Sequence, residues 1–380
     1  MIFRVISPVH HSGAASEHTH DVQCARHTSG QRIRRAVAAL SVAALGTLGL
    51  AACSDSGGQA QSGAESKEVT LVTHNNFNLP KESIAAFEKE SGLKLHLVQS
   101  DSGAELVNKL KLRKDNPIGD AVYGLATNDM GAVAKEGLLA PLDISLPEGA
   151  KTSAHPDEPN AVPIDRGDIC VNIDTEYFQK KGLAEPKTLD DLTKPEYKGL
   201  FVTINASDVT GFGFFAATVA RYGADGWQDY WKKLKANDVR IVPGWTEAYQ
   251  EDFTQGGNDG KYPIVLSYEG SPAYTVDEAV TKTTTKALPD TCYQNVEYAG
   301  VLTNAKNPKN AQKVIEWLLS QSVQSQIPDN MYMYPVDSSV ELPKAYQLAP
   351  QSKEASILKG SDVVENQEKW VKEWTELVAK

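Results

Sequence analysis

Two stretches of the chain place aromatic rings among small polar residues. They are "GWTEAYQ", which contains Trp245, and "VLSYEGSPAY", which contains Tyr268 and Tyr274. A cation held over the face of a Trp or Tyr ring gains roughly 0.5 to 2 kcal/mol beyond the burial of apolar area. These residues therefore favour recognition of a planar, cationic ligand. The alternative, that Trp245 and Tyr274 only pack in a core, stays open.

Each aromatic stretch follows an extended run that ends in turn residues. "DVRIVPGW" predicts a strand that ends at Pro243, and "YPIVLSYEGS" predicts a buried strand that ends at Ser267. The carboxyl ends of strands in an open α/β sheet border the ligand crevice. We therefore expect the side chains that follow both strands to line one site: Trp245, Tyr268, Ser271 and Tyr274.

A third predicted strand, in "VTINASDVTGFGFF", also ends in small polar residues. Ser207, Asp208 and Thr210 stand ahead of Gly211 and Gly213. Backbone N–H groups at a Gly-rich turn into a helix can hold a phosphate or a hydroxyl group. An ordinary tight turn is the alternative interpretation, because a single Gly-Phe-Gly is a weak signal.

The elements that would position these residues follow an α/β pattern. Strand and helix patterns alternate from residue 68 to residue 137, and a further extended run, "VPIDRGDICVNID", begins near residue 162. In one predicted strand Leu93, Leu95 and Leu97 stand at every second position. This alternation of strands and helices predicts an α/β fold with a parallel sheet flanked by helices.

Other aromatic residues have the spacing of a helix core. In "GADGWQDYWKKLKAN", the residues at i, i+3, i+4 and i+7 are Trp227, Tyr230, Trp231 and Leu234. This spacing predicts a helix face that packs in the core and has no ligand role. "NPKNAQKVIEWLLSQS" and the C-terminal "ENQEKWVKEWTELVAK" predict two more amphipathic helices, the second with Trp370 and Trp374 on one face.

The N-terminal region has the pattern of a secretory signal. A basic start precedes an apolar run from Ala36 to Ala52, and Leu50-Ala51-Ala52-Cys53 is a lipobox. We expect residues 1–52 to be removed, Cys53 to carry lipid, and residues 53–67 to form a flexible linker. The protein would then be extracytoplasmic and anchored to the outer face of the cell membrane by lipid alone. A weak transmembrane anchor is the alternative.

The charge of the chain limits its partners. Five Arg and only two acidic residues lie before residue 53, so the remainder carries 33 basic and 47 acidic residues, a formal net charge of −14. An acidic surface repels nucleic-acid phosphates and anionic lipid. Nucleic-acid binding is therefore not expected, and a cationic or neutral ligand is favoured.

The cysteines indicate one disulfide. Cys24 lies in the removable segment and Cys53 is the lipid acceptor, so Cys170 and Cys292 remain as an even pair in an oxidising compartment. A disulfide between them is the leading interpretation, and two buried free thiols are the alternative. Few histidines remain for a metal site, so we expect neither a metal nor a cofactor.

Several motifs resemble those of the thiamine-binding proteins of ABC importers. "GWTEAY", "VLSYEGSPAY" and "IPDNMYMYPV" are similar to motifs of that family, and "VPIDRG" and the terminal "WVKEW" fit the same pattern in matching order. The resemblance implies a two-lobed, periplasmic-binding-protein-like α/β fold with a hinged interlobe cleft. It also implies a monomeric solute-binding lipoprotein that binds thiamine or a thiamine phosphate and delivers it to a permease.

The resemblance also implies roles for individual residues. The cleft would be lined by Trp245, Tyr268, Ser271 and Tyr274, with Tyr332 where the family often has Trp. Asp165 would lie near the interlobe crossing, and Ser207, Asp208 and Thr210 would lie at the phosphate or hydroxyl end. Asn75 and Ala126 stand where the family has Asp, so the ligand set includes Asn75 in place of a carboxylate.

"VPIDRG" and "NVEYAGV" are predicted to be two extended crossings between the lobes. One lobe would contain residues 68–164 and about 297–335, and the other about 165–296 and 336–380. Such double crossings let two lobes close as rigid bodies about a hinge.

Three other functions compete with this interpretation. A surface-anchored hydrolase would have to recruit His74, His96 or His155, and none lies in a nucleophile motif, so we expect no enzyme. A ferric-iron binder of the same architecture typically uses adjacent tyrosines, and the chain has no Tyr-Tyr pair. Another organic cation, such as a polyamine, stays open as the ligand.

Overall fold

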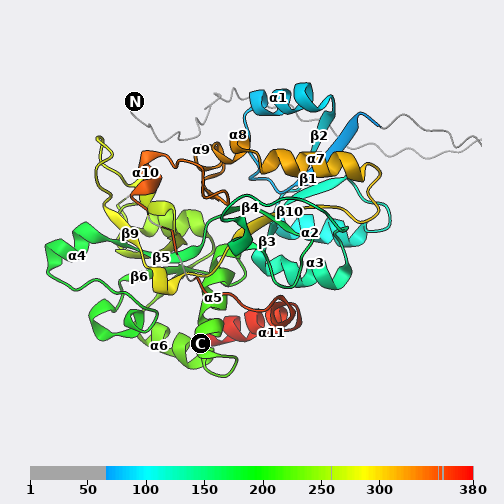
Figure 1. Ribbon diagram of the computed structural model, residues 1–380. Coiled ribbons are helices and arrows are strands. Elements are labelled where there is room, and N and C mark those ends of the chain that lie inside the picture. The colour runs from blue at the N-terminus through cyan, green and yellow to red at the C-terminus, as the bar shows by residue number, and fades with distance from the viewer. Residues whose placement is uncertain (1–65, 258, 350, 353–354, 380) are drawn as a thin grey trace, which may run out of the picture. The chain divides into compact units, whose positions relative to one another are not determined.

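A computed structural model describes residues 66–257, 259–349, 351–352 and 355–379 (Figure 1). The predicted signal segment, Cys53 and nearly all of the predicted linker lie outside the described residues. Within those ranges, no helix combines the length and the apolar character that crossing a membrane requires.

The first sheet contains six strands. The strand order is β11 (Tyr334–Pro335), β4 (Val162–Arg166), β10 (Val296–Val301), β3 (Ala121–Ala126), β1 (Glu68–Thr73), β2 (Lys94–Gln99). At one side of the sheet β1 pairs in parallel with both β2 and β3, whereas β10 is antiparallel to β3 and to β4. The predicted α/β class is confirmed by this alternation of strands and helices.

Helices cover this sheet and supply much of its core. Those in the N-terminal part of the chain are α1 (Lys81–Ser91), α2 (Gly103–Leu112) and α3 (Met130–Glu136). Those that follow β10 are α7 (Pro308–Leu318), α8 (Gln321–Gln324) and α9 (Ile327–Met331). The predicted helix at "NPKNAQKVIEWLLSQS" is confirmed as α7, which buries Val314, Trp317 and Leu318.

The strand pattern at Leu93, Leu95 and Leu97 is only partly matched by burial. Leu95 is buried, whereas Leu97 is 38% exposed. The difference arises because β2 is the last strand of its sheet and has a neighbouring strand on one side only. Alternation alone does not distinguish an edge strand from a central one.

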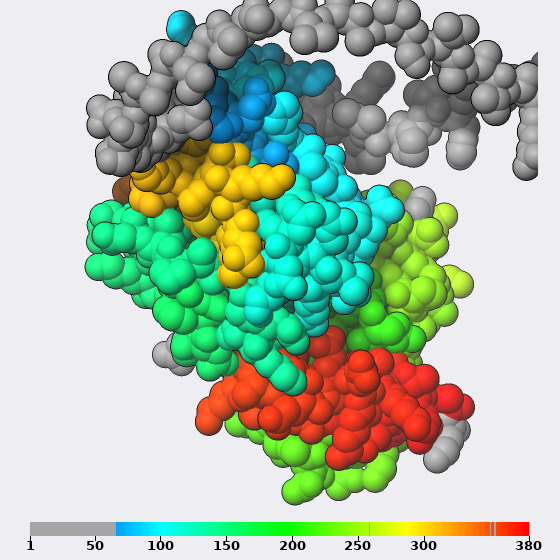
Figure 2. All heavy atoms as spheres, turned by 90° about the vertical axis from the view of Figure 1, so that its right-hand side faces the viewer, coloured from blue at the N-terminus to red at the C-terminus, as the bar shows by residue number. Residues whose placement is uncertain are grey.

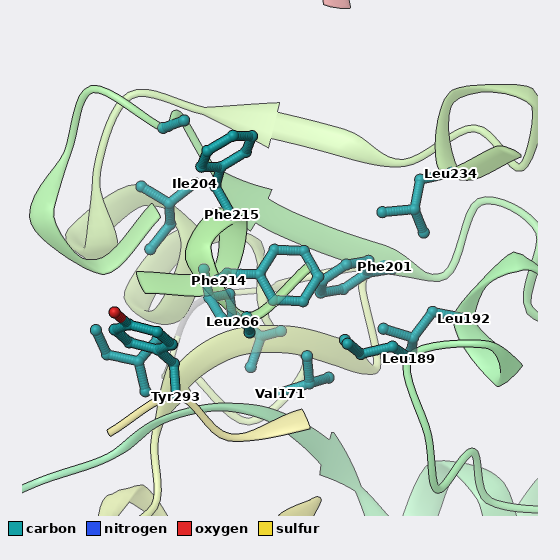
Figure 3. Packing of buried hydrophobic residues seen from close by; sticks show 14 of the residues in the cluster. Val171, Leu189, Leu192, Phe201, Ile204, Phe214, Phe215, Leu234, Leu266 and Tyr293 are labelled. Carbon is teal, nitrogen blue, oxygen red and sulfur yellow. The ribbon is translucent and has the colours of Figure 1, made fainter. Parts of the chain in front are cut away.

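The second sheet has five strands and its own core. The strand order is β7 (Arg240–Val242), β6 (Phe201–Ile204), β8 (Ile264–Tyr268), β5 (Ile169–Asp174), β9 (Thr285–Ala287). Its helices are α4 (Thr175–Lys181), α5 (Val209–Tyr222) and α6 (Trp227–Ala236), and the short α10 (Lys344–Gln347) lies near the C-terminus. Figure 3 shows how side chains from β5, β6, β8 and α5 meet in the core of this sheet.

The aromatic stripe predicted on "GADGWQDYWKKLKAN" lies in that core. Trp227, Tyr230, Trp231 and Leu234 of α6 are all buried. Trp231 also donates its indole N–H to Thr218 Oγ1 at 3.0 Å. The prediction of a packing face is confirmed.

The C-terminal helix α11 (Gly360–Ala379) contacts elements beside both sheets. Its Trp370 and Trp374 belong to the core of the second sheet. Its first residue touches α3, since a Cβ atom on Gly131 would lie 2.1 Å from the Gly360 carbonyl oxygen. Figure 2 shows α11, in red, at the surface beside the cyan part of the chain.

The chain passes between the two sheets through a buried ionic cluster. Arg166 donates to Asp168 at 2.5 Å, and its Nε lies 3.6 Å from Glu269 Oε1. The backbone N–H of Ser352 donates to Glu269 Oε2 at 2.6 Å. Burial and the charge of Asp168 together raise the pKa of Glu269 to about 7, although Arg166 acts to lower it. Three separate segments of the chain are thus held together at this crossing.

A disulfide lies beside the same crossing. Cys170 of β5 and Cys292, both buried, are joined across a sequence separation of 122 residues. The next residue, Tyr293, exchanges backbone hydrogen bonds with Ile169 at 3.0 and 2.8 Å. The pair therefore links the start of β5 to the segment that leads into β10.

Candidate functional site

Strand directions bring two sheet edges to the crossing. In the first sheet β1, β3 and β4 run the same way, so their carboxyl ends share one edge with the amino end of β10. In the second sheet β6, β7 and β8 are parallel, and their carboxyl ends share an edge with the start of β5. Because only two residues separate β4 from β5, the two edges adjoin where the chain crosses.

Trp245 stands at one of these carboxyl ends, directly before the π-helix η5 (Thr246–Asp252). Its indole N–H donates to Ser267 Oγ at 2.8 Å, and its ring stacks on Tyr249 at a centroid distance of 5.0 Å. The side chain is half-buried. π-Helical turns are uncommon and occur often at functional sites. The stacking partner and the hydrogen bond hold one ring face in a fixed orientation.

Ser271 connects the two aromatic stretches. Its hydroxyl lies 2.7 Å from the Ser267 hydroxyl, and it accepts the backbone N–H of Tyr268 at 3.2 Å. Its carbonyl oxygen accepts the Tyr249 hydroxyl at 3.4 Å. The expected gathering of Trp245, Tyr268 and Ser271 is therefore what the structure contains.

The turn into α5 joins the same group through Tyr268. The Tyr268 hydroxyl lies 2.9 Å from Thr210 Oγ1. Asp208 caps the helix, because its Oδ1 accepts the backbone N–H groups of Thr210 at 2.9 Å and Gly211 at 3.3 Å. The exposed Ser207 is turned to Asn205 Oδ1, to which its hydroxyl and its N–H both donate at 2.9 Å.

Tyr274 and Tyr332 form the exposed aromatic part of the site. Tyr274 is 50% exposed and Tyr332 is 65% exposed. Their ring centroids lie 5.6 Å apart at 66°, and the Tyr274 hydroxyl lies 2.6 Å from that of Tyr346. Tyr332 has φ of 60°, a left-handed conformation that is uncommon for a non-glycine residue. Tyr274 is thus not a core residue.

Asp165 lies in a different group, at the edge of the first sheet. It is fully buried, and the Tyr123 hydroxyl lies 2.6 Å from its Oδ2. The same hydroxyl lies 2.5 Å from Glu297 Oε2, and His74 Nε2 lies 3.0 Å from Glu297 Oε1. Burial raises the pKa of Asp165 well above its ordinary value, and the charge of Glu297 raises it further. Among the described residues, Asp165 forms no hydrogen bond or ion pair with Trp245 or Tyr274.

Asn75 and Ala126 also lie at this edge. Asn75 is exposed and follows β1, and Ala126 ends β3. The Ala126 backbone N–H donates to Asp129 at 2.9 Å, and burial raises the pKa of Asp129 to about 6. Two carboxyl groups, those of Asp129 and Glu297, therefore lie close to this edge, where the resemblance implies Asp at positions 75 and 126.

Neither Glu297 nor Tyr123 is among the residues predicted for the site. The available signal was an acidic residue inside the apolar run "NVEYAGV". A charged residue is rarely buried unless it is paired, so its position in a strand indicates a partner.

Two surface hollows lie away from these strand ends. The larger, of about 570 Å³, is lined by residues 143–147, Glu316 and Leu319. The smaller lies beside α2 and is lined by Leu110, Arg113 and Lys114 among others. Neither contains a residue predicted for the site.

Residues 82–354 match the family described as bacterial extracellular solute-binding protein. The chain belongs to this family. A thiamine-binding periplasmic protein of Brucella melitensis biotype 1 is 31% identical over 292 residues, which cover 76% of this solute-binding protein and 84% of the relative. The resemblance predicted from the sequence motifs is confirmed, and the family is one of extracytoplasmic, solute-binding proteins.

Solved structures agree with this assignment. A periplasmic thiamin binding protein has a TM-score of 0.65 and 26% identity, with 82% of this solute-binding protein and 96% of that chain covered. A ferric binding protein from Campylobacter jejuni has a TM-score of 0.64 at 20% identity, with 81% and 99% covered. The second likeness shows a shared fold only.

Proposed function

We propose that this solute-binding protein binds thiamine or a thiamine phosphate and delivers it to the permease of an ABC importer. The observation that carries the proposal is the pair of exposed aromatic side chains Tyr274 and Tyr332, whose ring centroids lie 5.6 Å apart. The chain is also 31% identical to a thiamine-binding periplasmic protein. Trp245 is connected to the segment that contains Tyr274 by two hydrogen bonds, from its indole N–H to Ser267 and between the hydroxyls of Ser267 and Ser271.

The chemistry of the ligand fits these side chains. Thiamine carries a permanently cationic thiazolium ring and a planar aminopyrimidine ring. A cation over an aromatic face and a net-negative protein both favour its binding. The hydroxyl groups of Ser271 and Thr210 would bond its polar atoms, and the turn from Ser207 to Thr210 would lie at its hydroxyl or phosphate end. Asn75 and Asp165 complete the proposed ligand set at the edge of the first sheet.

Ferric iron and polyamines are the competing ligands. Among the described residues, no three His, Cys, Asp or Glu side chains form a group that could hold a metal ion. A polyamine is a flexible cation without a ring, so it cannot stack on the planar aromatic side chains of the site. Mass spectrometry of small molecules released from protein purified without refolding tests the assignment. Thiamine or an ester is expected, and release of a polyamine instead would contradict it.

The two sheets are proposed to be the cores of two lobes that close on the ligand. Residues 68–164 with about 297–335 would form one lobe, and about 165–296 with 336–380 the other. Two short crossings beside the Arg166 cluster would act as the hinge.

Ligand-induced closure is expected to reduce the radius of gyration in small-angle X-ray scattering. The physical reason is that a ligand held by groups from both lobes binds the closed state more tightly and shifts the population towards it. The measurement compares the purified protein with and without saturating thiamine. Identical scattering profiles with proven binding would contradict hinge closure.

Cys53 is proposed to carry the lipid that anchors the protein. Substitution Cys53→Ala is expected to move the protein from the membrane fraction to the soluble fraction or to stall its processing, because the acyl acceptor is lost. Cell fractionation and immunoblotting measure this, with Cys24→Ala as the matched control. A Cys53→Ala variant that still fractionates with membranes would refute the lipoprotein assignment.

A further inference from the structure

The turn into α5 was expected to accept a phosphate or a hydroxyl, and its geometry distinguishes the two. Asp208 Oδ1 already accepts the N–H groups of Thr210 and Gly211, at 2.9 and 3.3 Å. The donors of Ser207 are likewise directed to Asn205. A phosphate placed there would meet occupied donors and a carboxylate of its own sign. A neutral hydroxyl group would meet no such repulsion.

A second carboxylate lies across the crossing from this turn. Glu297 occupies the amino end of β10, where it pairs with Ala126 of β3 and Asp165 of β4. Its side chain is 19% exposed, so it reaches the sheet edge and is not sealed in the core. Asp165 Oδ1, fully buried beside it, has no hydrogen-bond donor among the described residues.

Glu297 is held in its charged form. Burial acts to raise its pKa, but His74, Tyr123 and Asp165 lower the pKa by a larger total amount through charge and hydrogen bonds. The proton of the two adjacent carboxyl groups therefore belongs to Asp165, whose pKa is raised. The edge of the first sheet keeps one ionised carboxylate.

Both carboxylates act on Tyr268, which belongs to the proposed site. Burial raises the pKa of the Tyr268 hydroxyl, and the charges of Asp208 and Glu297 raise it further. Tyr268 in turn bonds Thr210 at the first turn of α5. On the other side, Tyr123 lies 3.6 Å from the sulfur of Met331, which precedes the exposed Tyr332. Hydrogen bonds therefore connect Asp208 to Tyr268 through Thr210, and connect Glu297 through Tyr123 to the residue before Tyr332.

We propose that Asp208 and Glu297 make this site selective for unphosphorylated thiamine over its phosphate esters. The inference rests on the proposed function and names the form of the ligand. Thiamine carries one positive charge, whereas a phosphate monoester adds about −1.5 to −2 charges at pH 7 and makes the ester net negative. Glu297 is the counter-charge of the cationic ring, and Asp208 repels the ester group.

The protonation of the cluster sets the direction of a pH effect. Burial lowers the pKa of His74, but Glu297 and Asp129 raise it by more, so the net pKa is higher than usual, and Tyr123 packs against the His74 ring. A protonated His74 offsets the charge of Glu297, and a protonated Asp129 carries none. Loss of either proton makes the edge more negative, so thiamine affinity should rise as the pH is raised from below about 6, where Asp129 titrates, through the raised pKa of His74.

The test is calorimetric titration of the purified protein with thiamine and with thiamine monophosphate. We expect wild type to bind thiamine at least about tenfold more tightly than the monophosphate. The reason is that Glu297 attracts the cationic ligand, whereas Asp208 repels the phosphate group that only the monophosphate carries. Asp208→Ser keeps a capping oxygen but removes the charge, and Glu297→Gln keeps the shape of the side chain. Each substitution should narrow the ratio of the two dissociation constants by about fivefold or more.

Glu88→Gln is the matched control. Glu88 pairs with Lys94 at 3.0 Å at the amino end of β2, the opposite end of that sheet, and its loss changes the net charge equally. In this control the ratio of the dissociation constants for thiamine and its monophosphate should stay within about twofold of the wild-type ratio. Equal or tighter binding of the monophosphate by wild type, or ratios unchanged in both test variants, would overturn the inference. No binding of either ligand by wild type would instead reject the proposed function.

Discussion

Trp245→Ala is expected to weaken thiamine binding by about thirty-fold to several-hundred-fold. The substitution removes the cation–π interaction and the buried contact area of an anchoring aromatic residue, together roughly 2 to 4 kcal/mol. It also leaves Ser267 without the indole N–H that it accepts at 2.8 Å, and Tyr249 without its stacking partner. Calorimetric titration with thiamine measures the loss.

Trp227→Ala separates affinity from stability. Trp227 is fully buried in α6 and packs edge-on against Phe215 at 4.9 Å. Its removal should lower the free energy of unfolding by about 3 to 5 kcal/mol while the folded fraction keeps its affinity for thiamine. Equal binding by wild type and Trp245→Ala would remove Trp245 from the site, and a parallel loss in both variants would indicate a general effect on folding.

Loss of the disulfide is expected to have the largest effect on stability. Cys170 and Cys292 close a loop with a sequence separation of 122 residues, and the chain-entropy estimate for a loop of this size is about 4 to 5 kcal/mol. The double variant Cys170→Ala, Cys292→Ala should unfold at a correspondingly lower urea concentration. Both residues are buried, so the small apolar replacements leave no unpaired polar group.

Reduced wild type is the control for that variant. Urea unfolding of wild type with a thiol reductant should approach the curve of the double variant, whereas the reductant should leave the variant unchanged. A double variant within about 1 kcal/mol of oxidised wild type would show that the bridge contributes little to the stability of this fold.

The sequence predicted those features that depend on local patterns. The helix period of Trp227, Tyr230, Trp231 and Leu234 placed the core face of α6. The turn residues after three strands placed Trp245, Tyr268 and Thr210 at carboxyl ends, where hydrogen bonds now connect them through Ser271.

Features that depend on the pairing of strands far apart in the sequence could not be predicted from such local patterns. Glu297 acquires its partners because β10 lies between β3 and β4, which are more than a hundred residues away in sequence. The exposure of Leu97 likewise follows from the position of β2 at the edge of the sheet. Neither the strand order nor the register can be read from the alternation of residues within one strand.

Asp208 illustrates a further limit. Its residue type and position before a Gly-rich helix start are equally consistent with a ligand group and with a helix cap. The structure gives it the capping hydrogen bonds, and this changes what the turn into α5 can accept.

Recognition of thiamine through the aromatic group at the strand ends is the core of the proposed function. Isothermal titration of wild-type protein with thiamine is the decisive measurement. We expect saturable binding at one site per chain, strongly weakened in Trp245→Ala. No heat of binding and no thermal shift with thiamine or its monophosphate would contradict it.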